Sequence, residues 1–162
     1  MPASPQDAAS ASLAWALSFA RGYLALGMLG PAERTLKDLS PLLHCHPEVM
    51  SLHSHLLIAR RRWRKVVTHA RHAVQLFPDA AEYYVHAATA LDMLGRRAAG
   101  RKVWASAPPT VRANGTLHLY IARFEARLGN VDAARDHIAS AFDLDPRLRA
   151  VVARDPQLTA VL

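Results

Sequence analysis

Residues 129–146, with the sequence GNVDAARDHIASAFDLDP, contain the pattern that decides the fold of this chain. A glycine opens the stretch, alanines follow at set positions, and a proline closes it. Residues of the same kinds lie 34 positions earlier, and again at two and three times that interval. Four columns result: Ala20, Ser54, Ala88 and Ala122; Ala32, Val66, Gly100 and Ala134; Leu39, Ala73, Ala107 and Ala141; and Gly27, Arg61, Gly95 and Gly129.

A fixed period of this length is typical of stacked helix–turn–helix units. It predicts an all-α fold in which each of about four repeats holds two antiparallel helices. The repeats are expected at 13–46, 47–80, 81–114 and 115–148, followed by a C-terminal capping helix over 149–162. We expect residues 1–10 to form a disordered leader and residues 11–162 to form one domain.

The small residues in the columns have a physical reason. Two helices approach closely only where small side chains lie at their crossing, so Ala20 is expected to face Ala32, and Ala88 to face Gly100. The glycine column is expected to end the first helix of each pair, because glycine adopts the left-handed conformation at low cost. Asn130 is expected to cap the helix that begins at Val131.

The charge, cysteine count and apolar runs of the chain limit the kinds of partner and the compartment that we expect. The chain has 162 residues with 20 basic and 13 acidic side chains, which gives a net charge of +7 and favours an acidic partner. The single cysteine, Cys45, excludes an internal disulfide and is typical of a reducing compartment, so we expect a cytoplasmic protein. No apolar run is long enough for a membrane span. The excess of arginine and alanine suggests a bacterial source.

The best-matching repeats carry a resemblance to the tetratricopeptide repeat superfamily. Besides residues 129–146, the third repeat has its pattern at Tyr84, Ala87, Ala88, Leu91, Gly95, Gly100, Trp104 and Ala107. The chain departs from the family at Arg61, where a glycine is usual, and at Glu125, where Tyr23 and Leu57 stand in earlier repeats. The resemblance covers about 135 residues and implies a solenoid scaffold, such as an adaptor or a chaperone, whose first helices line a concave groove for a partner segment.

The family pattern places twelve residues in that groove, and together they would form a mixed apolar and cationic surface for an acidic or amphipathic segment. They are Leu17, Ser18, Arg21, Ser51, Leu52, His55, Val85, His86, Thr89, Leu119, Tyr120 and Arg123. Family members that clamp acidic chaperone tails use asparagine and lysine there, and this chain has neither at these positions.

A narrower resemblance is to the bacterial type III secretion chaperones built on tetratricopeptide repeats. It rests on the string Tyr84-Val85-His86-Ala87-Ala88, which is followed by Leu91 and Gly95 and preceded by Leu42-Leu43-His44. It implies a cytoplasmic chaperone for a secreted protein.

Basic residues gather at two inter-helix turns that are one repeat apart, and they include nine of the 20 in the chain. They are Arg60, Arg61, Arg62, Arg64, Lys65, Arg96, Arg97, Arg101 and Lys102. Stacked repeats would align them along one edge. That edge is either a solvated surface or a docking surface for an acidic protein or for nucleic acid, and nucleic-acid binding would be strongly salt-dependent.

Catalytic and metal-binding signatures are missing from the sequence. There is no Gly-rich phosphate loop, serine elbow or pair of catalytic carboxylates, so we expect no enzymatic activity and no cofactor. His53 and His55 are two apart and lie on different faces of a helix, and His69 and His72 could meet but have no carboxylate or second cysteine nearby in the sequence. No metal site is therefore expected. Self-assembly through the apolar C-terminal tail and the open N-terminal face is a further alternative.

Overall fold

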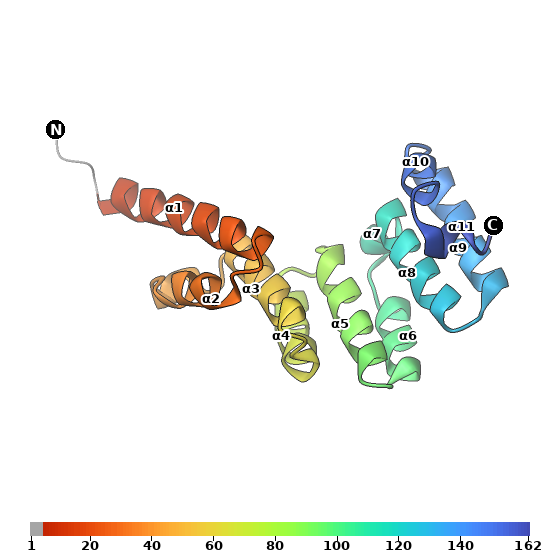
Figure 1. The fold of residues 1–162 in the computed structure, drawn as a ribbon, viewed down its shortest axis with the longest axis horizontal. Helices are drawn as coiled ribbons and strands as arrows, with labels where there is room; N and C mark the ends of the chain where they lie inside the picture. The colour runs from red at the N-terminus through yellow and green to blue at the C-terminus, as the bar shows by residue number, and fades with distance from the viewer. Residues whose placement is uncertain (1–4) are drawn as a thin grey trace. The chain divides into compact units, whose positions relative to one another are not determined.

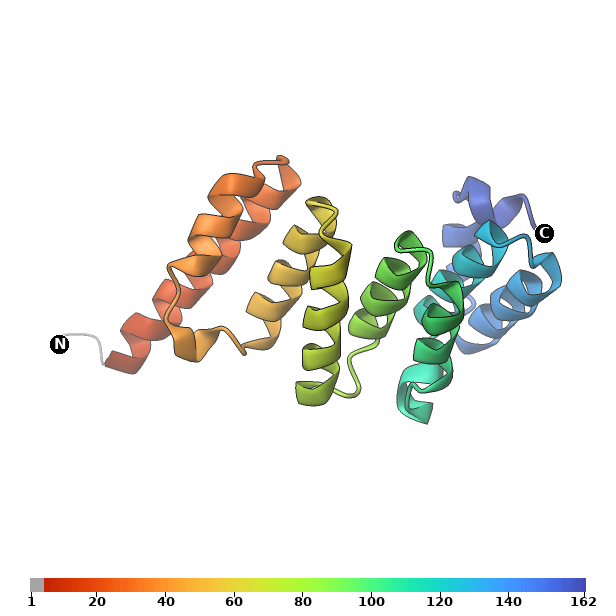
Figure 2. The ribbon, with the colours of Figure 1, turned by 90° about the horizontal axis from the view of Figure 1, so that it is seen from below.

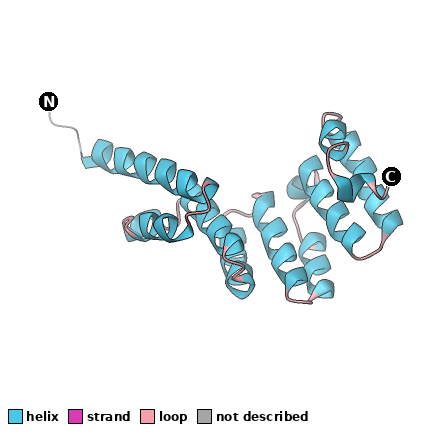
Figure 3. Ribbon diagram, in the orientation of Figure 1, coloured by secondary structure: helices cyan, strands magenta, loops and turns pink. Residues whose placement is uncertain are grey.

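The computed structural model describes residues 5–162, with side chains from residue 11 onward. Every regular element in that range is helical, and the connections between them are loops and turns (Figure 3). The prediction of an all-α protein is therefore confirmed. None of the helices in residues 5–162 is both long and apolar enough to cross a membrane.

The helices are labelled in Figure 1. They divide into two compact units, with the boundary between His69 and Ala70. The first holds α1 (Pro5–Ala25), α2 (Leu29–Lys37), the short 3-10 helix η1 (Pro41–Leu43), α3 (Pro47–Ala59) and the start of α4 (Trp63–Leu76). The second holds the rest of α4 and the following helices: α5 (Ala81–Met93), α6 (Arg97–Ala105), α7 (Pro109–Arg112), α8 (Gly115–Arg127), α9 (Val131–Leu144), α10 (Leu148–Val152) and α11 (Pro156–Thr159).

Helix bounds recur at the interval seen in the sequence. The second helix of each pair begins at Leu29, Trp63, Arg97 and Val131, positions spaced by 34 residues. The helices α3, α5 and α8 share the same spacing at both ends. The first helix departs from it at its start, because α1 extends back to Pro5. Of the expected leader 1–10, residues 1–4 lie outside the described residues and residues 5–10 are helical, as their alanine content favours.

All four inter-helix turns have the same backbone geometry. The second residue beyond the end of the first helix has a positive φ, which is 70° at Gly27, 54° at Arg61, 74° at Gly95 and 79° at Gly129. At each turn the next amide donates to a carbonyl five residues back, as Asn130 N does to Glu125 O at 3.0 Å. This bond satisfies an end carbonyl of the helix. Arg61 therefore adopts the glycine conformation without being glycine.

In the first unit, α1 and α2 lie side by side and both pack on α3 (Figure 2). Their small column residues, Ala20 and Ala32, are fully buried. The surrounding core is apolar and consists of Ala16, Leu17, Leu36, Leu39, Val49, Leu52 and Leu56.

In the second unit, α5 pairs with α6, and α8 pairs with α9. A Cβ built on Gly100 would lie 3.3 Å from the Ala88 carbonyl oxygen, so the expected approach of Ala88 and Gly100 is confirmed. Ala122 and Ala134 are fully buried in the α8–α9 pair.

The predicted single capping helix over 149–162 is wrong in detail, because two short helices, α10 and α11, occupy this region. The break comes at Asp155-Pro156, where the Asp155 carboxylate accepts from Gln157 N at 2.9 Å and the proline starts a new helix. Leu148, Val152 and Leu158 are buried against α8 and α9, so the segment covers the end of the second unit.

Candidate binding site

The residues of the first unit that are predicted to line a groove differ in exposure, because some are buried and others are exposed. Leu17 and Leu52 are buried in its core, so their assignment to a ligand-contacting surface is wrong. The Arg21 side chain is exposed and forms an ion pair with Glu48. His55 is exposed, and its Nδ1 lies 2.9 Å from the carbonyl oxygen of Ser51. Ser18 is also exposed.

The predicted groove residues of the second unit are likewise partly buried and partly exposed. Val85 and Leu119 are buried, so their assignment to the groove is wrong, whereas His86 and Thr89 are half-buried. Tyr120 is exposed, and the Arg123 guanidinium lies over its ring at 5.3 Å from the centroid. Arg123 also binds Asp155, at 2.5 Å between Nε and Oδ2. Burial alone would raise the pKa of Asp155, but the Arg123 hydrogen bond and backbone amides lower it.

Several of the nine basic-edge residues are engaged within their own unit. In the first unit, Arg60 and Arg62 both pair with Glu33, at 2.7 Å and 3.7 Å. In the second, Arg97 pairs with Asp92 at 3.6 Å and Arg101 with Glu125 at 2.6 Å. The others are exposed: Arg61, Arg64, Lys65, Arg96 and Lys102. The ion pairs leave less free positive charge than the sequence suggests.

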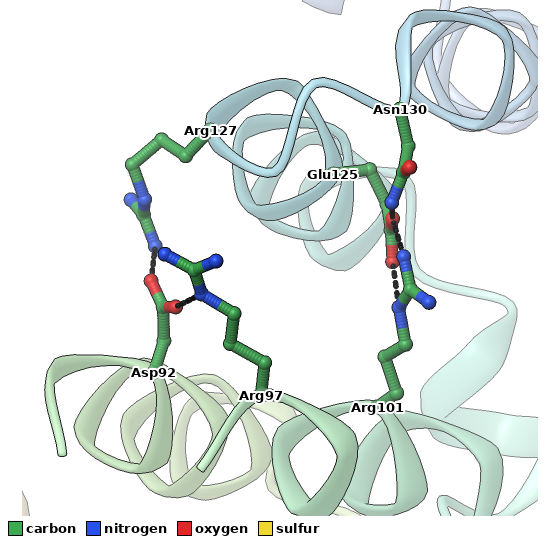
Figure 4. A network of polar contacts seen from close by, with 6 residues as sticks. All are labelled: Asp92, Arg97, Arg101, Glu125, Arg127 and Asn130. Atoms are coloured by element: carbon green, nitrogen blue, oxygen red, sulfur yellow. Dashed lines mark hydrogen bonds and ion pairs between the residues drawn. The ribbon is translucent and has the colours of Figure 1, made fainter. Parts of the chain in front are cut away.

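A network of hydrogen bonds in the second unit is built around Glu125 (Figure 4). This carboxylate is 6% exposed and accepts two hydrogen bonds from Arg101, from Nε at 3.0 Å and from Nη2 at 2.6 Å. Asn130 donates a third from Nδ2 at 2.6 Å. Asn130 therefore makes no side-chain cap on α9, contrary to expectation, because its amide is turned to the carboxylate. Burial alone would raise the pKa of Glu125, but these hydrogen bonds lower it.

A second carboxylate lies close by on α5. Asp92 accepts from Arg127 Nη2 at 2.9 Å and pairs with Arg97 at 3.6 Å (Figure 4). Ion pairs thus join α5 to α8 and α6 to α8, which fixes the Arg101 and Glu125 side chains on the wall of the adjacent cavity.

That cavity has a volume of about 300 Å³ and is lined by α6, α7, α8 and α9. Part of its wall is apolar, from Trp104, Ala105, Leu117 and Ile121. The rest is polar or charged, from Arg101, Arg112, His118, Glu125 and His137. Its volume is at the lower end of the range for ligand sites, and an apolar wall with a few convergent polar groups is typical of them.

Two of the lining histidines contact each other. Their Nδ1 atoms are 3.0 Å apart, and His118 Nε2 lies 2.9 Å from the Arg112 carbonyl oxygen. A carbonyl only accepts, so His118 Nε2 carries a proton; in the neutral ring its Nδ1 is then the acceptor, and His137 Nδ1 is the donor. The pKa of His137 is lowered by burial and then by the neighbouring His118. A neutral pair satisfies this geometry, whereas two cationic rings would repel.

Trp104 supplies a donor that is not used within the described part of the chain. Its side chain is 7% exposed and packs edge-on against Phe124, with ring centroids 6.4 Å apart. Its indole Nε1 is buried without a hydrogen-bond partner among residues 11–162. A buried donor without an acceptor costs about 1–3 kcal/mol of stability.

The sequence did not point to this cavity as a site. Glu125 interrupts an apolar column in the sequence, but the predicted site residues do not include His118, His137 or Arg112. One signal was present: His137 lies two intervals after His69, whose ring is also close to a histidine, with 5.1 Å between the centroids of His53 and His69. Within the described residues, no group of three histidine, cysteine, aspartate or glutamate side chains is placed to hold a metal ion.

Comparison of the chain with protein-family models and with curated proteins finds no match to either.

Proposed function

We propose that this chain is a tetratricopeptide-type helical repeat protein that acts by binding a segment of another protein, as a non-enzymatic, cytoplasmic adaptor or chaperone. The support for the repeat class is the 34-residue interval of the helix bounds, together with four turns of one geometry. Repeat proteins of this kind present surfaces for binding, and the chemistry of the site decides what is bound.

The observation that carries the proposal is the cavity between α6 and α9. Its apolar wall suits an apolar anchor side chain, and the Arg112 guanidinium suits an anion next to it. Arg101 is less available, because Glu125 already takes two of its hydrogen bonds. The ligand favoured by this wall is an acidic and apolar segment, which also fits the net charge of +7.

Phage display of random twelve-residue peptides against the full chain tests the proposal. We expect selected peptides to combine an aromatic or aliphatic residue with an aspartate or glutamate. Ala105→Trp, which places a bulky ring on the cavity wall from an exposed position, should abolish their binding. The matched control is Ala98→Trp, at an exposed position of the same helix that does not line the cavity.

Selected peptides that bind Ala105→Trp and wild type equally would contradict the cavity as the site. A failure to select any peptide would contradict segment binding itself.

A further inference from the structure

One side of α1 is exposed and apolar. Trp15, Phe19 and Leu26 are 60%, 43% and 75% exposed, and Gly22 is exposed with open space where a Cβ would be. These positions are four, three and four residues apart, so they follow one side of the helix. The Trp15 and Phe19 rings are in contact, with centroids 4.4 Å apart. We call these four residues the α1 outer face.

The same positions are covered in later helices. One interval after Trp15 and Gly22 come Val49 and Leu56 of α3, which are 3% and 2% exposed because α1 and α2 pack on that helix. Three intervals after Trp15 and Phe19 come Leu117 and Ile121 of α8, which are 1% and 7% exposed. In α3 and α8, a preceding helix pair covers the positions that correspond to the α1 outer face. Among residues 11–69, no helix pair covers the α1 outer face itself.

The chemistry of this face does not suit an acidic partner. None of its four residues is charged, and their neighbours on either flank are uncharged too: Ala11, Ser12, Ser18 and Tyr23. The nearest cation, Arg21, is paired with Glu48. The occupant must therefore offer apolar surface of matching shape.

The order of large and small residues matches a second copy of the same helix. In a two-fold pair, residue i of one copy contacts residue j of the other, and j contacts i. An antiparallel α1 pair centred between Phe19 and Gly22 places Phe19 against the partner copy's glycine at 22, where the space is open. The same centre places Trp15 against the partner copy's leucine at 26, because these two positions are equally far from the centre.

We propose that the α1 outer face is a homodimer interface, in which two α1 helices pair antiparallel about this centre. A single helix pair is at the small end of specific interfaces, so the dissociation constant is expected to be on the order of micromolar. This interface is separate from the cavity in the second unit.

Sedimentation equilibrium of the full chain tests the interface. We expect a dimer for wild type and for Ala14→Glu, whose exposed position lies on α1 outside the outer face. Phe19→Glu should raise the dissociation constant at least about 100-fold, because it buries an unpaired charge near the centre of an apolar interface. Circular dichroism of each variant checks that the helices are intact, and phage-selected peptides should still bind Phe19→Glu.

A size-exchange variant tests the pairing itself. Phe19→Ala and Gly22→Phe should each weaken the dimer about tenfold or more, and the double variant should recover most of the loss by exchanging the large and small positions. A wild-type chain that is monomeric at about 100 µM would overturn the proposal. Dimers that persist in Phe19→Glu, or a double variant weaker than either single one, would also overturn it.

Discussion

The α1–α2 and α8–α9 pairs have the same kinds of residue at their helix crossings and turns, but they present different surfaces. Both cross at fully buried alanines, Ala20 with Ala32 and Ala122 with Ala134, and both turn at a left-handed glycine. They differ at Tyr23, whose equivalent is the buried carboxylate of Glu125 beside a cavity. The shared positions thus hold each helix pair together, whereas the positions that differ supply the candidate binding surfaces.

The largest expected loss of stability comes from enlarging the buried alanines at the helix crossings, which both pairs share. Ala20→Leu and Ala122→Leu each insert a bulky side chain at a fully buried crossing, which should cost about 1–3 kcal/mol of unfolding free energy. Urea unfolding followed by circular dichroism measures it. Ala14→Leu, at an exposed position of α1, is the control and should change stability by less than about 0.5 kcal/mol. Equal losses at all three positions would mean that the columns do not mark the crossings.

The Glu125 network is the next difference to test. Arg101→Ala removes two hydrogen bonds to a buried carboxylate and should lower the melting temperature, although the exposure of half of the Arg101 side chain limits the loss. Glu125→Leu restores the apolar residue found at Leu57 and Leu91, so it should be neutral or stabilising. Adding Glu125→Leu to Arg101→Ala should therefore recover the loss, and thermal unfolding of the four chains measures this. A loss that remains in the double variant would contradict the role given to Arg101.

Stability should also depend on pH through His137. Its pKa is lowered in the folded chain, so the unfolded chain binds the proton first as the pH falls. The folded state is therefore penalised as the pH falls below the usual histidine pKa of about 6.5, and the unfolding free energy should decrease from there toward pH 5. His137→Asn should reduce the slope of unfolding free energy against pH. His53, whose pKa is lowered by burial and by His69, acts in the same direction and should leave a residual slope.

The smallest effect is expected at the turns. Arg61 has a φ of 54°, a conformation that glycine adopts more readily, so Arg61→Gly should stabilise the chain by about 0.5–1 kcal/mol. Gly95→Arg, the reverse change at the equivalent turn, should destabilise it by a similar amount. Melting temperatures that move the opposite way would show that other Arg61 contacts outweigh the backbone conformation.

Much of the helix arrangement could be predicted from the sequence, because the constraints on it are local. A glycine ends a helix through its own backbone, and small residues mark a crossing whatever surrounds them, as Gly95 and Gly100 show. The burial of Leu17 and Val85 could not be predicted from local sequence, because it depends on how closely the neighbouring helices pack over them. The break at Pro156 was missed, although a proline after an aspartate is a known start signal for a helix.

The cavity was harder to predict because its residues come from four helices. His118 and His137 are 19 residues apart, and their contact depends on the rotation of α8 against α9. The unused donor of Trp104 depends on side-chain packing, which the 34-residue pattern does not specify. Glu125 was the visible clue, since it interrupts an otherwise apolar column.

The resonance of the Trp104 indole N–H tests the central claim, that the cavity between α6 and α9 binds a ligand with an apolar group and a negative charge. It can be followed in a two-dimensional ¹H–¹⁵N spectrum and assigned with Trp104→Phe. On titration with 3-phenylpropionate, a small carboxylate on an apolar ring, we predict a saturable shift of this resonance that is absent in Ala105→Trp and retained in Ala98→Trp. A Trp104 resonance that stays unmoved up to about 10 mM probe, beyond the millimolar affinity expected of so small a ligand, would contradict the claim.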